Sequence, residues 1–230
     1  MPATTTKASR TARRRRGADA TTREHVLDVA LQCFAELGFD GSSTRIIATR
    51  AGVNQGLIPY YFGTKDALWR EAVDRAFERL VGGVGDAAID VDDVSDRERL
   101  ALLVRRYVRF VAANPEFVML MNEEGKRSGK RMRWLVDTHV RPVFASIKRL
   151  YERARSEGGI PQEIRSPHFE YLFAGAAAAI FHQAPECRRL FDVDPADPAV
   201  VENHADALCQ LFLGDASLGR RRRRKRSRKG

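Results

Sequence analysis

Amide, phenol and ammonium groups are concentrated in one short segment of this chain, residues 54–65. A short helix is predicted over 55–62, because Ile58 and Phe62 are four apart and would share its buried face. A preceding short helix and a tight turn would hold this helix away from the body. Two short helices joined in this way allow a small domain to place one helix in the major groove of DNA. The chemistry expected of the segment is therefore recognition of DNA.

The elements that would position this helix can be read from its flanks. Ser43 is a good N-cap for a helix over 44–51, since its hydroxyl can accept a bond from a backbone N–H of the first turn. The buried face of that helix is expected to hold Ile47, Ala48 and Ala51. Gly52 follows, where a chain leaving a helix often adopts positive φ. Asn54 is expected to cap the helix over 55–62, and Thr64 to cap the next one.

An earlier helix is predicted from Thr21. Thr21 and Glu24 have the spacing of a capping box. The apolar residues that follow recur at the helical spacing i, i+3, i+4, i+7, at Leu27, Ala30, Leu31 and Phe34. Gly38 is the expected C-terminal stop. Residues 21–81 are therefore predicted to form one small helical domain.

This arrangement resembles the DNA-binding domain of the TetR family of bacterial transcriptional regulators. The resemblance covers residues 21 to about 80. The matching residues are Ile47, Ala48, Ala51, Gly52, Val53, Gly56, Tyr61, Phe62, Lys65 and Leu68. It implies an all-α protein with an N-terminal helix-turn-helix domain and a larger C-terminal helical domain for ligand binding and dimerisation.

The resemblance implies which residues meet DNA. Gln55 would bond an adenine through its amide, and Leu57 would touch a thymine methyl. Tyr60 and Tyr61 would bond phosphates, which position the protein without reading sequence. The full expected set is Thr44, Arg45, Gln55, Gly56, Leu57, Pro59, Tyr60, Tyr61 and Lys65. The alternative for a tyrosine is half-buried packing, and for Lys65 a solvated surface position.

Pro59 departs from the family pattern, which usually has a hydrogen-bonding residue there. Proline within a helix removes one backbone bond and can kink the helix. Either Pro59 stiffens a short helix, or it also deprives the helix of one usual bond to DNA.

The charge of the chain is unevenly distributed. Six basic residues lie in 1–18 and nine in 220–230, with no acidic residue in either stretch. The remaining 25 basic and 30 acidic residues give residues 19–219 a net charge of −5. The two ends, 1–20 and 214–230, are predicted to be disordered basic tails, since blocks of like charge repel and bury nothing. The tails are either simply solvated ends or segments that increase the affinity of the protein for the phosphates of nucleic acid.

Residues 82–213 continue in a helical pattern, with about nine helices expected in the whole chain. Pro142 lies inside a long helix predicted over 130–156, so a kink or break is expected there. The last two long helices, 167–183 and 198–213, are the expected homodimer interface by resemblance, and the alternative is an intramolecular core. The interface candidates are Phe169, Leu172, Ala176, Ile180, Val201, Leu208, Leu211 and Phe212.

The resemblance also implies a small-molecule effector, whose identity the sequence does not fix. Aromatic and methionine side chains suit an adaptable apolar pocket, although at helical spacing they are more often core. The pocket candidates are Trp69, Tyr107, Phe110, Met119, Met121, Trp134, Phe144, Phe173 and His182. His139 and His182 lack the cysteine or acidic spacing of a metal site, so no metal and no cofactor are expected.

Other classes of function fit less well. No phosphate-cradling glycine loop, nucleophile elbow or H-E-x-x-H pattern is present, so no enzyme activity is expected. A protein that coats nucleic acid through its tails, without reading sequence, is the alternative.

Cys33, Cys187 and Cys209 are widely spaced and are expected to be free thiols. The sequence has no secretory signal and no long apolar run, so a cytoplasmic, nucleoid-associated protein that makes no membrane contact is predicted. Its predicted function is that of a homodimer that represses transcription from an operator in double-stranded DNA and responds to a ligand. Activation by the same binding is equally compatible with the sequence.

Overall fold

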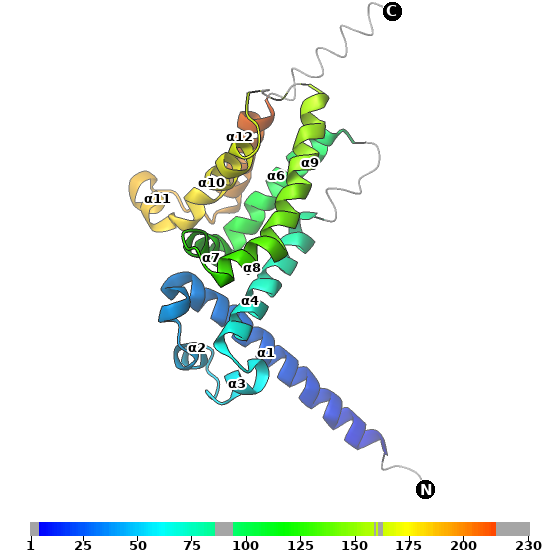
Figure 1. Cartoon of the computed structure of the whole chain (residues 1–230), viewed down its shortest axis with the longest axis vertical. Helices are drawn as coiled ribbons and strands as arrows, with labels where there is room; N and C mark the ends of the chain where they lie inside the picture. The colour runs from blue at the N-terminus through cyan, green and yellow to red at the C-terminus, as the bar shows by residue number, and fades with distance from the viewer. Residues whose placement is uncertain (1–4, 86–93, 159, 161–162, 215–230) are drawn as a thin grey trace, which may run out of the picture. The chain divides into compact units, whose positions relative to one another are not determined.

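The computed structural model describes residues 5–85, 94–158, 160 and 163–214, with side chains from Asp19 onward. All secondary structure in these ranges is helical, which confirms the predicted all-α fold (Figure 1). The chain divides into two compact units, Met1–Ala76 and Phe77–Gly230. The division falls inside a helix, slightly before the boundary predicted after residue 81. The expected C-terminal tail lies outside the described residues, apart from Gly214.

The N-terminal unit contains α1 (Thr5–Gly41), α2 (Thr44–Arg50), α3 (Leu57–Phe62) and most of α4 (Lys65–Leu80). Ser43 caps α2 as predicted, accepting a bond from the Ile46 N–H at 3.2 Å. Thr64 caps α4 in the same way, accepting from the Ala67 N–H at 3.1 Å. The buried side of this unit is made of apolar residues from all four helices, including Val26, Ala30, Phe34, Ile47, Ile58, Phe62 and Leu68.

Helix α1 is longer than the sequence predicted. It starts at Thr5, so most of the stretch expected to be a disordered tail is helical, and Thr21 lies inside the helix instead of at its start. The physical reason is that residues 5–37 contain no proline, and their alanines, arginines and leucines are good helix formers. Gly38 interrupts the helix as expected, with φ of 69°.

The turn into α3 also differs from the prediction. Asn54 does not cap α3 directly. Its side-chain oxygen accepts a bond from the Gly56 N–H at 2.8 Å, and the helix begins only at Leu57. Pro59 is consequently the third residue of α3, where a backbone N–H has no partner within the helix in any case. The carbonyl of Pro59 still accepts from the Gly63 N–H at 3.0 Å. Proline at this position therefore breaks no helical hydrogen bond.

The C-terminal unit is built around α6 (Asp96–Ala113), which packs against α12, α9 and α10. The other elements are η1 (Val81–Gly85), α7 (Pro115–Gly125), α8 (Lys130–Leu135), η2 (Val136–Val140), α9 (Arg141–Ser156), α10 (His168–His182), α11 (Ala184–Phe191) and α12 (Pro198–Leu213). The nine predicted helices are all present, with α8, η2 and α9 running on as one. Helix α11 was not predicted. The core of α6 consists of Leu100, Val104, Val108 and Val111, which are fully buried.

The long helix over 130–156 has the irregularity that Pro142 predicted. A π-helical turn, η2, lies directly before Arg141 and Pro142. Pro142 has no N–H to offer the carbonyl four residues earlier, and its ring crowds that carbonyl. One wider turn lets the helix pass the proline without ending.

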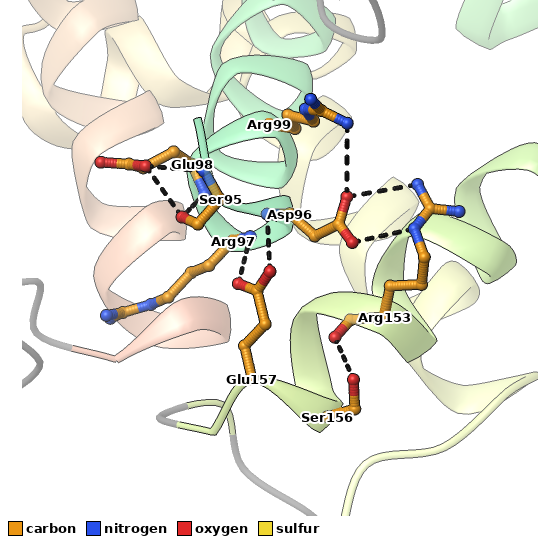
Figure 2. Close-up of polar contacts among 8 residues, drawn as sticks. All are labelled: Ser95, Asp96, Arg97, Glu98, Arg99, Arg153, Ser156 and Glu157. Carbon is orange, nitrogen blue, oxygen red and sulfur yellow. Dashed lines mark hydrogen bonds and ion pairs between the residues drawn. The ribbon is translucent and has the colours of Figure 1, made fainter. Parts of the chain in front are cut away.

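The start of α6 is joined to the ends of two other helices (Figure 2). The Glu157 carboxylate, just after α9, accepts from the backbone N–H groups of Asp96 and Arg97 at 3.0 and 3.2 Å. Arg153 of α9 pairs with Asp96 at 2.9 Å. The Arg97 guanidinium donates to the carbonyls of Leu213 and Gly214 at the end of α12, at 2.7 and 2.9 Å. Side chains at these helix ends thus form hydrogen bonds with the free backbone groups at the ends of neighbouring helices.

Candidate DNA-binding surface

Helices α2 and α3 form a two-helix unit with a buried side and an open side. Ile47, Ala48, Ala51, Ile58 and Phe62 are buried, as the sequence predicted. Gly52 adopts φ of 65°, which turns the chain between the two helices. The open side of α3 and the start of α2 carry most of the predicted DNA-contacting residues.

The predicted contact residues differ in exposure. Arg45, Gln55, Gly56, Pro59 and Tyr60 are exposed, and Thr44, Leu57, Tyr61 and Lys65 are half-buried. None of them is part of the buried core. Tyr60 is the most open, with 77% of its surface exposed, and its ring meets the edge of Tyr61 at 5.1 Å between centroids. An exposed phenol of this kind is able to donate a hydrogen bond to a phosphate oxygen.

Tyr61 is placed differently from Tyr60. Its hydroxyl lies near the Asp19 carboxylate of α1. Desolvation, and then the negative charge of Asp19, raise the pKa of Tyr61. A carboxylate near this hydroxyl repels a phosphate, because both carry negative charge. Of the two predicted phosphate contacts on α3, Tyr60 is therefore the more open.

Lys65 lies over an aromatic ring, with its Nζ 4.4 Å from the centroid of Phe39. This cation–π contact holds the half-buried side chain at the start of α4. It leaves the three N–H donors of the ammonium group chemically available. The predicted phosphate contact by Lys65 is compatible with this position, whereas the alternative of a freely solvated lysine is not.

Two residues that the sequence reasoning missed hold α3 against α1. The Arg23 guanidinium lies 5.1 Å from the centroid of the Phe62 ring and also pairs with Glu71 of α4. Asp19, four residues earlier on α1, lies near the Tyr61 hydroxyl. Both residues lie on one face of α1, because positions four apart on a helix are neighbours. Their spacing was visible in the sequence, but Asp19 fell within the expected tail.

The predicted pocket residues do not form one group. Trp69 is fully buried in the N-terminal unit, while the other eight belong to the C-terminal unit. The Tyr107 ring contacts the Phe173 ring in a tilted arrangement, with 5.3 Å between centroids, and burial raises the pKa of Tyr107 to about 12. Phe144 meets Tyr171 at 6.3 Å, and His182 bonds the Ala178 carbonyl at 3.0 Å. Met119 and Met121, on α7, are half-buried.

Phe110 and Trp134 belong to a chain of ring contacts that we call the aromatic cluster, consisting of Phe77, Phe110, Phe117, Trp134 and His139. Phe117 meets both Phe110 and Phe77, at 5.3 and 5.2 Å. His139 stacks on Phe77 at 4.6 Å and meets Trp134 at 5.2 Å. His139 lies in the π-helical turn η2. Three members of the cluster, Phe77, Phe117 and His139, were absent from the predicted pocket.

The predicted dimer residues divide into buried and exposed halves. Phe169, Val201, Leu208 and Phe212 are buried inside the C-terminal unit, and Phe169 stacks on Tyr151 at 3.7 Å. These four lie where α10 and α12 pack side by side within one chain (Figure 1), as the intramolecular alternative expects. Leu172 and Leu211 are 55% and 65% exposed, and Ala176 and Ile180 are half-buried. Tyr171, which was not predicted, is 73% exposed.

Three further properties bear on the class of protein. Among the residues that the structure describes, no group of three or more His, Cys, Asp or Glu side chains is arranged to hold a metal ion. None of the described helices combines the length and the apolar character needed to cross a membrane. The three cysteines are free, with Cys33 and Cys187 buried.

Comparison with known proteins gives two family matches. Residues 26–72 match the model of the bacterial regulatory proteins of the tetR family, and residues 97–211 match the tetracyclin repressor-like C-terminal domain. The HTH-type transcriptional repressor NicS of Pseudomonas putida is 30% identical over 114 residues. That alignment covers 49% of this chain and 52% of NicS, so the chain spans about half the length of this relative.

Solved structures share the fold across most of the chain. A TetR transcriptional regulator family member from Streptomyces coelicolor A3 superposes with a TM-score of 0.58 at 25% identity, covering 82% of this chain and 89% of the other. AibR, solved in complex with isovaleryl coenzyme A and operator DNA, gives a TM-score of 0.66 at 16% identity, covering 84% and 98%.

Proposed function

The chain belongs to the tetR family of bacterial regulatory proteins, and we propose that it is a homodimeric transcriptional repressor that a small molecule releases from its operator. The observation that carries the proposal is the open side of the two-helix unit, where Gln55, in the turn before α3, and Tyr60, on α3, are both exposed. Exposed amide and phenol groups at the start and on the open side of a short helix are suited to the major groove.

Residues of α3 and of the turn before it have proposed roles in the groove. The Gln55 amide bonds the N6 and N7 positions of an adenine, and Leu57 touches a thymine methyl. Tyr60 donates to a phosphate and fixes the register of the helix. Arg45 and Lys65 add phosphate contacts on either side, from α2 and α4. Pro59 reads nothing itself and only shapes the helix that carries the others.

The exposed side of α10 and α12 is the proposed dimer interface. Leu172 and Leu211 offer apolar area, and Gly175 of α10, which has open space where a Cβ would lie, allows close approach of a second copy. Closed two-fold pairing is the commonest arrangement of soluble oligomers. It would place two α3 helices against half-sites about 34–36 Å apart, and the operator would accordingly be a pseudo-palindrome.

The effector is proposed to bind in the C-terminal unit beside the aromatic cluster. Apolar and aromatic side chains with a few polar groups are typical of small-molecule sites. AibR provides a precedent, since it was solved with both a coenzyme A thioester and operator DNA. A molecule that binds the two conformations of the dimer unequally would change operator affinity by about 1–3 kcal/mol. The protein would act in the cytoplasm, where such molecules and the DNA meet.

Selection of binding sites from random duplex DNA with the full chain tests the repressor proposal. At about 0.15 M salt, enrichment of an inverted repeat is expected. The variant Gln55→Ala should then lose discrimination at one base pair of each half-site by about 1–3 kcal/mol. A protein that only coats nucleic acid through its basic tails would enrich no sequence, and Gln55→Ala would change nothing.

Fluorescence of Trp134 tests the effector proposal. Trp134 and Trp69 are the only tryptophans, so Trp69→Phe leaves a single reporter in the aromatic cluster. Acyl coenzyme A thioesters are the first probes, and a saturable change in Trp134 emission together with release from the selected operator is expected. A change in emission that leaves operator binding intact would contradict the regulatory role. Thermal unfolding of Trp69→Phe without probe is the control for its folding.

A further inference from the structure

Two carboxylates are buried among the residues that the structure describes, and they differ in their partners. Glu124 of α7 forms an ion pair with Arg131, at 3.5 Å. Glu170 of α10 is 4% exposed, and its Oε2 atom has no hydrogen-bond partner within the described part of the chain. Burial of a carboxylate is strongly unfavourable unless the group is paired or hydrogen-bonded, so the position of Glu170 requires an explanation.

Glu170 lies on the face of α10 that points into the C-terminal unit. Phe173, Ala177 and Phe181 follow it at i+3, i+7 and i+11, and all three are buried. The helix packs against α6, α7, α9 and α12. The Oε2 atom is therefore directed toward the interior of the unit and not toward solvent.

Two polar side chains lie near Glu170, and both have other contacts. Burial raises the pKa of Tyr151 of α9, Arg155 lowers it, and the Glu170 charge adds to the increase. The Tyr151 O–H donates to the Ile164 carbonyl at 2.8 Å, so its one proton is already used. The Arg155 guanidinium lies over the Tyr151 ring, 5.8 Å from its centroid, and not at the Glu170 carboxylate. Neither group satisfies Oε2.

A row of rings leads from Glu170 to the aromatic cluster. Phe173, one turn after Glu170, contacts Tyr107 of α6 at 5.3 Å between ring centroids. Phe110, a member of the cluster, follows Tyr107 by one turn of α6. Rings of this kind offer apolar surface and also attract cations through their faces. An apolar molecule with a cationic end suits a row of rings that ends at a buried carboxylate.

We propose that Glu170 anchors the effector and that the effector is an amine, whose ammonium group donates hydrogen bonds to Oε2 while its apolar body lies along these rings. The inference rests on the proposed function, because it takes the C-terminal unit as the effector site. An organic acid at this position would be repelled by Glu170, since both groups carry negative charge. Acyl coenzyme A thioesters, which are also anionic, are the contrasting class of probe.

Calorimetry with the full chain tests the class of effector. Primary amines with phenyl, naphthyl and octyl bodies are compared with the alcohol and the carboxylate of the same body. The amine should bind most tightly in each set, and Glu170→Gln should weaken its binding by at least about 30-fold, because the variant keeps the shape of the side chain but removes its charge. Glu186→Gln, on the exposed surface of α11, is the matched control and should bind the amine as the unmodified chain does.

Thermal unfolding without any probe separates an anchor from a structural residue. Glu124→Gln breaks an ion pair and should lower the melting temperature. Glu170→Gln removes a buried charge that has no partner, so it should keep the melting temperature or raise it. A decrease as large as that of Glu124→Gln would show that Glu170 supports the fold instead of a ligand.

The outcomes for the inference and for the proposed function can be told apart. The inference is wrong if no amine binds the unmodified chain more tightly than its matched carboxylate, or if Glu170→Gln leaves amine binding unchanged. An acyl coenzyme A thioester that nevertheless releases the selected operator would leave the repressor proposal standing. An amine that binds through Glu170 without releasing the operator would instead overturn the proposed role of the effector.

Discussion

The two neighbouring tyrosines of α3 should respond very differently to removal of their hydroxyl groups. Tyr60 is 77% exposed, whereas Tyr61 is half-buried and its hydroxyl lies near the Asp19 carboxylate. Tyr60→Phe removes a donor to a charged phosphate, which is worth about 1.5–3 kcal/mol. That is about 10- to 150-fold in affinity for one half-site. Tyr61→Phe removes no DNA contact, so its effect on operator affinity should stay below about 3-fold.

Each variant carries an internal check. Neither variant should change the free energy of unfolding by more than about 0.5 kcal/mol, because neither tyrosine belongs to the buried core. Fluorescence anisotropy with one labelled operator measures the affinities, and urea unfolding measures the stabilities. Equal decreases in affinity for both variants would refute the assignment of Tyr60 as the phosphate contact, and a larger decrease for Tyr61→Phe would reverse it.

Three further predictions concern the C-terminal unit. Burial raises the pKa of Tyr107 to about 12, so the stabilising effect of its neutral phenol is complete below pH 10 and is lost as the pH rises from about 10 to 12. Tyr107→Phe should flatten that part of the curve of unfolding free energy against pH, measured by urea unfolding. Leu211→Asp should convert the dimer to monomer in sedimentation, with Leu37→Asp in α1 as the control that stays dimeric. Arg97→Ala leaves the carbonyls at the end of α12 without their donor and should lower the free energy of unfolding by about 1–3 kcal/mol.

Local signals in the sequence were sufficient for most of the helices, although α11 and the first part of α1 were missed. The caps Ser43 and Thr64, the positive φ at Gly52 and the irregular turn before Pro142 all depend on residues close together in the chain. Such signals depend only on residues within a turn or two of backbone, so they can be recognised from the sequence alone. The same reasoning identified the two-helix unit and its buried residues.

Contacts between distant residues could not be read in this way. Arg23 and Glu71 are 48 positions apart, and nothing local indicates that Arg23 also lies over Phe62. Helical spacing identified an apolar stripe on α10 and α12 but did not say which part faces the chain's own core. Phe169 and Phe212 are buried there, while Leu172 and Leu211, from the same stripes, are exposed. Helical spacing identifies which face of a helix is apolar, but only the tertiary structure shows what packs against that face.

The reading helix itself depends on such tertiary packing. An isolated helix shorter than about 12–15 residues is marginal in water, and α3 has six residues. Its shape must therefore come from burial of Ile58 and Phe62 and from the Arg23 side chain that lies over the Phe62 ring. Pro59 fits this account, because at the third position it breaks no hydrogen bond and its fixed φ restricts the unfolded chain. The proline that departs from the family pattern thus helps to preserve the helix on which the proposed DNA contacts depend.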